Sequence, residues 1–157
     1  MPTIKLNKFR ARQFGNVPYG NLAILSETLA TSATGAAINA NSTAPIANGD
    51  KVVLGALPAG MTLTDFLARV STAFTASVVA NVGFEYQDGV DSATVPQDAS
   101  YFASGLTLHT TGTYRLANDK APVVLPKPAF LVLTLGGANN AKAARVDVSV
   151  IGEMAGG

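Results

Sequence analysis

Residues 78–86 read Val78-Val79-Ala80-Asn81-Val82-Gly83-Phe84-Glu85-Tyr86, and this stretch decides the fold. Apolar side chains fall on every second position from Val78 to Tyr86, with Asn81 and Glu85 among the residues between them. A period of two is typical of a β-strand that buries one face. The turn pair Asp88-Gly89 follows closely. The stretch therefore predicts a half-buried strand.

Residues 61–74, which precede it, fit two structures. A helical stripe at i, i+3, i+4, i+7 and i+11 is formed by Leu63, Phe66, Leu67, Val70 and Phe74. One face of a strand is formed equally well by Phe66, Ala68, Val70, Thr72 and Phe74. Intrinsic preference does not decide, because Leu and Ala favour helix whereas Val, Thr and Phe favour strand. The neighbouring strand favours a strand here too.

Further short apolar segments lie between turn residues along the chain. They are residues 51–56, 106–116 with a bulge at Gly112, 123–125, 129–135 and 145–150. Residues 22–25 and 36–38 fit either edge strands or an ordered loop, and residues 87–105 are expected to form a long loop. The turn at residues 136–140 predicts that the last strand pairs with residues 129–135. Seven or eight such strands predict an all-β, two-sheet antiparallel sandwich over residues 21–157.

The composition narrows the function classes. Only 13% of the 157 residues are charged, about half the usual share of soluble domains, which favours a surface covered by neighbouring subunits and thus a homo-oligomer or larger assembly. A net charge of +1 argues against nucleic-acid binding. No apolar run approaches the roughly 20 residues of a membrane span, and no secretory signal is expected. The chain has no cysteine, so disulfides and thiolate zinc sites are excluded.

Catalytic motifs are not found in the sequence. His109 is the single histidine, is expected on a strand, and is accompanied by no Gly-x-Ser-x-Gly motif. Glu85, Asp88, Asp91 and Asp98 fall in a stretch without a positive charge. Such a loop could bind calcium, but its spacing matches no EF-hand, so a solvated acidic loop is the simpler interpretation. We expect no enzyme activity, no metal and no cofactor.

Residues 1–20 have a different character from the rest of the chain. Four of the eleven positive charges lie there, no acid occurs before Glu27, and Gly15, Pro18 and Gly20 disfavour regular structure. One interpretation is a solubilising tail, and the other is an extended basic arm that docks on an acidic partner or adds a strand to its sheet. The predicted partner-binding residues are Ile4, Lys5, Leu6, Lys8, Phe9, Arg10, Arg12 and Phe14.

Part of the sequence resembles the small head decoration, or cement, proteins of tailed bacteriophages. The resemblance is carried by Asp50-Lys51-Val52-Val53-Leu54-Gly55-Ala56-Leu57-Pro58-Ala59-Gly60, then Leu63 and Val70-Ser71-Thr72-Ala73-Phe74. It implies a jelly-roll-like sandwich on the outer surface of the capsid that bridges subunits of the major capsid protein.

A carbohydrate- or receptor-binding module of a virion is the alternative, because sandwiches of this size also serve as lectin-like domains. It predicts an aromatic-lined groove near Tyr101, Phe102 and Tyr114, although the absence of tryptophan disfavours sugar stacking.

Overall fold

The computed structural model describes residues 1–6, 22–116 and 118–154, and this part of the chain is all β. It contains ten strands and no helix, so none of its segments is a helix that could cross a membrane. The strands are β1 (Thr3–Lys5), β2 (Leu22–Thr31), β3 (Lys51–Leu57), β4 (Met61–Thr72), β5 (Val79–Tyr86), β6 (Asp98–Thr107), β7 (Gly112–Arg115), β8 (Val123–Val124), β9 (Ala129–Gly136) and β10 (Ala144–Met154).

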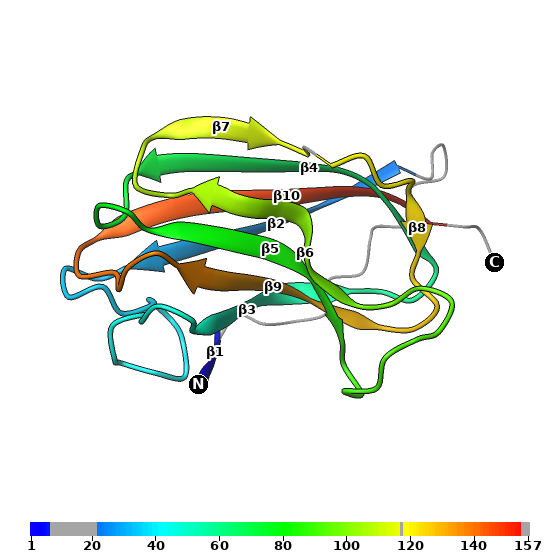
Figure 1. Cartoon of the computed structure of the whole chain (residues 1–157), viewed down its shortest axis with the longest axis horizontal. Helices are drawn as coiled ribbons and strands as arrows, with labels where there is room; N and C mark the ends of the chain where they lie inside the picture. The colour runs from blue at the N-terminus through cyan, green and yellow to red at the C-terminus, as the bar shows by residue number, and fades with distance from the viewer. Residues whose placement is uncertain (7–21, 117, 155–157) are drawn as a thin grey trace.

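The strands form two sheets, which confirms the predicted sandwich. One sheet has the order β1-β3-β9-β5-β6, and the other has the order β2-β10-β4-β7, with β8 also paired to β4. The pairing of β1 with β3 is parallel, and all the other strand pairs are antiparallel. The long strands run lengthwise through the molecule (Figure 1). Neither sheet alone could bury its apolar face, so the two faces pack against each other.

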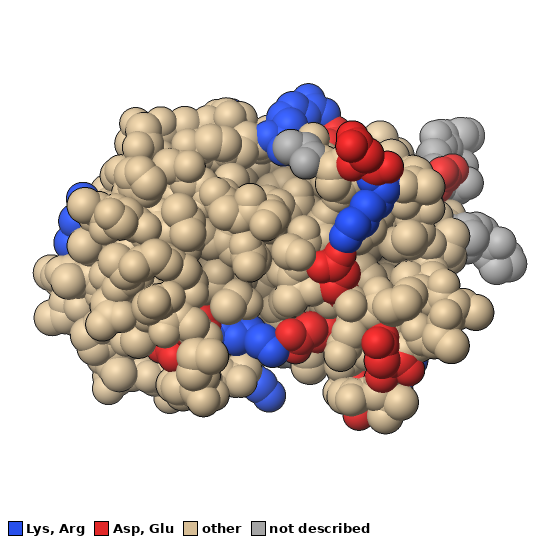
Figure 2. Space-filling model, viewed as in Figure 1, with Lys and Arg blue, Asp and Glu red and all other residues tan. Residues whose placement is uncertain are grey.

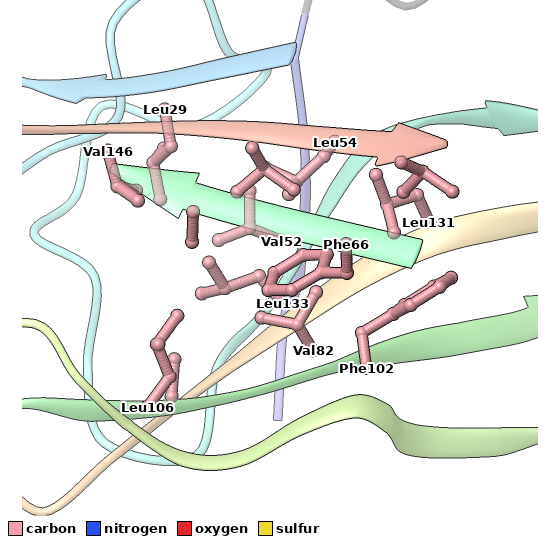
Figure 3. Close-up of a cluster of buried hydrophobic side chains, with 14 of the residues drawn as sticks. Leu29, Val52, Leu54, Phe66, Val82, Phe102, Leu106, Leu131, Leu133 and Val146 are labelled. Atoms are coloured by element: carbon pink, nitrogen blue, oxygen red, sulfur yellow. The ribbon is translucent and has the colours of Figure 1, made fainter. Parts of the chain in front are cut away.

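The core lies between the sheets and draws side chains from both (Figure 3). The ring of Phe66 on β4 stacks on Phe102 of β6, with centroids 5.3 Å apart and planes inclined by 21°. Leu29 and Val146 come from the same sheet as Phe66, whereas Leu133 comes from the other. All five side chains are at most 1% exposed. Burial of this kind contributes about 1.5–3 kcal/mol for each large side chain and holds the layers together.

Residues 61–72 form strand β4, and its geometry explains the helix-like spacing of the sequence. The pairing of β4 with β10 skips Thr64, since Leu63 faces Gly152 whereas Asp65 faces Ile151. Because a bulge adds one residue to the strand, successive inward-facing side chains are there three positions apart instead of two. Leu63 and Phe66 therefore both point into the core, and their spacing of three positions imitates a helical turn.

The expectation of a loop over residues 87–105 is wrong in its second half, because β6 begins at Asp98. Residues 99–102 of β6 lie opposite the single residue Gly83 of β5. At this irregularity both Tyr101 and Phe102 are buried, so the alternation of a regular strand is lost. The strand expected from Leu106 to Leu116 is in fact divided, because β6 ends at Thr107 and β7 starts at Gly112 in the other sheet.

The prediction that the last strand pairs with residues 129–135 is also wrong. β9 lies between β3 and β5, whereas β10 lies between β2 and β4 in the second sheet. The connection of residues 137–143 therefore crosses from one sheet to the other. Asn140, fully buried, holds this crossing: its amide nitrogen donates to Thr31 Oγ1 at 3.0 Å and to the Lys142 carbonyl at 2.9 Å, and its Oδ1 accepts from the Thr75 backbone at 3.2 Å.

Candidate interaction surfaces

The start of the predicted arm lies in the body of the sandwich. Ile4 and Leu6 belong to the core, with 2% and 7% of their surface exposed. Asn41 accepts a hydrogen bond from the Lys5 backbone on its Oδ1 at 2.8 Å and donates its own backbone N–H to the Lys5 carbonyl at 2.9 Å. The Lys5 ammonium lies 5.9 Å from the centre of the Phe130 ring. Ile4 and Leu6 thus pack within this chain, which differs from the expectation that they anchor a partner.

The other predicted arm residues lie outside the described part of the chain. They are Lys8, Phe9, Arg10, Arg12 and Phe14. Their role toward a partner, like the boundary of the arm at residue 20, stays a prediction.

His109 lies between β6 and β7 rather than on a strand, and its side chain is exposed. Its Nδ1 is 3.0 Å from the Val78 carbonyl oxygen. Because a carbonyl only accepts hydrogen bonds, Nδ1 is the donor, and the backbone N–H of His109 donates to the same oxygen at 3.2 Å. The imidazole thus fastens the chain at the end of β6.

The acidic stretch, which lacks local cations in the sequence, receives them from distant segments. Three of its four acids form ion pairs with lysines from elsewhere in the chain: Lys51–Glu85 at 2.6 Å, Lys127–Asp88 at 2.8 Å, and Lys120–Asp98. The fourth, Asp91, accepts hydrogen bonds from the backbone of Gln97 at 2.7 Å and of Ser92 at 2.8 Å. Among the described residues no group of three or more acids or histidines could hold a metal ion.

These ion pairs shift the pKa of two carboxyl groups below their usual range. The hydrogen bond from Lys127 is the main cause of the lowered pKa of Asp88. Burial acts to raise the pKa of Asp98, but hydrogen bonds from Lys120 and Ser100 outweigh it and lower the pKa. Both carboxylates are therefore charged and paired at neutral pH.

The aromatic residues of the alternative interpretation do not line one groove. Phe102 lies in the core, and Tyr101 is 5% exposed, with its ring edge-on to Phe84 at 5.5 Å. Tyr114 lies on β7 of the other sheet. A shallow pocket beside Tyr101 is lined mainly by residues 94–98, where the β5–β6 loop joins β6, and by Lys120 and Val123. Nothing in this arrangement offers a sugar two exposed aromatic faces.

The outward side of the β2-β10-β4-β7 sheet is a further candidate surface, and we call it the β10 face. Its outward residues form rows across the strands: Ile24–Ile151–Asp65, Ser26–Ser149–Leu67 and Thr28–Asp147–Arg69. The hydroxyls of Ser26 and Ser149 are 2.9 Å apart, and Thr28 Oγ1 donates to Asp147 at 2.6 Å. Six of these nine side chains are apolar or hydroxylated.

Charged side chains on the β10 face neutralise one another. Arg145 and Asp147 form an ion pair at 3.0 Å, and Arg115 pairs with Asp65. The hydrogen bond from Arg145 is the largest cause of the lowered pKa of Asp147. On the opposite side of the molecule, which Figure 2 shows with β5 and β6 in front, charged groups are also few. The surface therefore offers a neutral layer rather than a charged patch.

The comparisons with known proteins concern the fold alone. No protein-family model and no curated protein sequence matches the chain. A chain in the capsid of Ralstonia phage GP4 matches with a TM-score of 0.67 at 11% identity, over 99% of this chain and 100% of that chain. A chain in the capsid asymmetric unit of cyanophage Pam1 matches with a TM-score of 0.60 at 14% identity, over 94% and 95% of the two chains. Each matched chain thus has the same fold along almost its whole length.

Proposed function

We propose that the chain is a structural protein of a phage capsid that decorates the outer surface of the head and bridges subunits of the major capsid protein. One observation carries the proposal: the mutual match, over 99% and 100% of the two chains, with a chain of the Ralstonia phage GP4 capsid. Because the match covers nearly all of both chains, the matched capsid chain is similar in size to this one, and is thus a small chain. A small chain added to a shell fits a decoration role.

The physics of the surface supports the same role. Charged residues make up 13% of the sequence, and in the described part of the chain ten of them are joined in five ion pairs. A low-charge surface loses little on desolvation when it is covered by neighbouring subunits. A capsid lattice repeats one surface many times, so modest contacts gain from avidity.

The test is binding to heads that lack this chain, purified from the phage whose genome encodes it. We expect the purified protein to sediment with these heads and to add density outside the shell in electron cryomicroscopy. Decorated heads should also withstand higher temperature than bare heads. If the protein does not bind the heads but binds to a glycan array, the carbohydrate-binding alternative is favoured.

A further inference from the structure

Exposed apolar side chains gather on one side of the sandwich. Among the described residues, six large apolar side chains are exposed, and three of them extend along the β2-β10-β4 sheet and its β8 edge: Leu22, Ile24 and Val124, with exposed fractions of 63%, 61% and 49%. Leu22 and Val124 lie in one row, joined by Glu153 and Thr62. Ile24 lies in the next row beside Ile151. These side chains extend the β10 face from β2 across β10 and β4 to β8.

The charges of this face define what can cover it. Its charged side chains are three arginines and three acids, namely Arg69, Arg115, Arg145, Asp65, Asp147 and Glu153. The formal charges cancel, and two arginines are already paired with two of the aspartates. A covering surface that is itself neutral leaves these pairs intact. A strongly acidic or basic partner would have to compete with them and would leave one member of a pair uncompensated.

The short side chains of the face also favour docking. Ser26, Ser149 and Thr28 are held by hydrogen bonds across the strands before any partner binds. Immobilising such side chains costs less entropy than immobilising lysine or glutamate. The opposite outer face carries Lys5, a long flexible side chain, and the Lys51–Glu85 ion pair, across β1, β3 and β5.

The size of the face argues against a second copy of this chain as its occupant. The five strands of the face, β2, β10, β4, β7 and β8, lie about 4.8 Å apart and rise about 3.3 Å per residue, so together they span roughly 600 Å² in projection. A stable pair of proteins buries about 800 Å² on each partner. An isolated dimer held by this face alone would therefore be weak. A repeating shell can use a face of this size, because each chain is held by several contacts at once.

We infer that the β10 face is the surface that docks on the shell, and that its occupant is a neutral, partly apolar patch on the outer surface of the capsid subunits. The inference rests on the proposed function and adds the orientation of the sandwich on the head. The sheet that contains β3, β9 and β5 then faces away from the shell.

The test compares two substitutions that add the same charge at equally exposed positions. Ile24→Lys changes the β10 face, and Val90→Lys changes the tip of the β5–β6 loop, where Val90 is also 61% exposed. We expect Ile24→Lys to weaken binding to heads that lack this chain by about tenfold or more, because a lysine would be buried without a partner. Val90→Lys should bind like the unmodified chain. Ser26→Lys, also on the β10 face, provides a second variant should Ile24→Lys fail to fold by circular dichroism.

The outcomes separate the inference from the proposed function. If the unmodified chain does not bind the heads, the proposed function itself fails. If it binds and Ile24→Lys binds equally well, the decoration role stands and the docking face is a different one. If the unmodified chain is oligomeric in solution and Ile24→Lys is monomeric, the face belongs to a second copy and the inference is overturned.

Discussion

The substitution Ile4→Ala tests whether the N-terminal strand belongs to the core. Ile4 is 2% exposed, lies on β1 opposite Val52 of β3, and belongs to the core between the sheets. Truncating a buried isoleucine to alanine typically costs about 2–5 kcal/mol of unfolding free energy. Because β1 is a three-residue strand at the edge of its sheet, neighbours can relax into the space, and we expect the lower half, about 2–3 kcal/mol.

For a chain of this length, about 2–3 kcal/mol corresponds to a fall in melting temperature of roughly 4–12 °C. The chain has no tryptophan, so far-ultraviolet circular dichroism or tyrosine fluorescence should follow urea and thermal unfolding. Thr3→Ala is the matched control, because Thr3 is exposed on the same strand and its loss should change stability by less than about 0.5 kcal/mol. An Ile4→Ala variant as stable as this control would refute the packing of β1 in the core.

A second prediction concerns the basic residues of the predicted arm and their binding to phage heads. Neutralising Lys8, Arg10 and Arg12 by alanine leaves Ile4 and Leu6 in place. If these cations dock on an acidic partner surface, the triple variant should bind heads more weakly, and rising salt should reduce the difference. Equal binding of the triple variant at low salt would contradict the predicted arm.

Three further predictions concern single groups. His109→Ala should bind heads like the unmodified chain and lose at most about 1.5 kcal/mol of stability, the value of one hydrogen bond; a selective loss of function in a folded variant would reopen the question of an enzyme. Gly83→Ala should destabilise by about 1–3 kcal/mol in urea unfolding, because its Cβ would lie 2.0 Å from the Asp98 carbonyl oxygen; a neutral result would contradict the close approach of β6. The pKa values of Asp88 and Asp98 are lowered in the folded chain, so their contribution to stability is present above the unfolded pKa of about 3.9 and is lost as pH falls below it. The melting temperature should therefore stay level from neutral pH to about pH 5 and fall below about pH 4, and a profile that stays level to lower pH would contradict these ion pairs.

Alternation at residues 78–86 and apolar runs at residues 51–56 and 129–135 allowed three strands to be predicted from the sequence with little error. The structure has strands at residues 79–86, 51–57 and 129–136, so each predicted end is at most one residue away. Bulges limit this kind of prediction. The skipped Thr64 imitates a helical period, and the four residues opposite Gly83 hide the strand that carries Tyr101 and Phe102. An extra residue shifts the side-chain pattern by one position, so a sequence window no longer shows which face is buried.

The choice of partner strand could not be predicted from local pattern. The expected hairpin of residues 129–135 with residues 145–150 is not formed, although both segments are strands and the connection contains the turn residues Gly137, Asn139 and Asn140. A short turn and a crossing between two sheets use similar residues. What distinguishes them here is Asn140, which is buried and hydrogen-bonded to Thr31 of β2 and to Thr75 of the β4–β5 connection. Hydrogen bonds between one side-chain amide and residues so distant in the chain cannot be predicted from a local sequence pattern.

The candidate surface depends on the same kind of long-range arrangement. The sequence shows few charges and an acidic stretch without nearby cations, and only the fold brings Lys51, Lys120 and Lys127 to that stretch. On the β10 face the strand register likewise places Arg115 of β7 beside Asp65 of β4, 50 residues apart in the chain. Exposed pairs of this kind add little to stability. Their effect is to leave the surface without a net field, and a surface without a net field is suited to being covered by a neutral neighbour rather than to attracting a charged ligand.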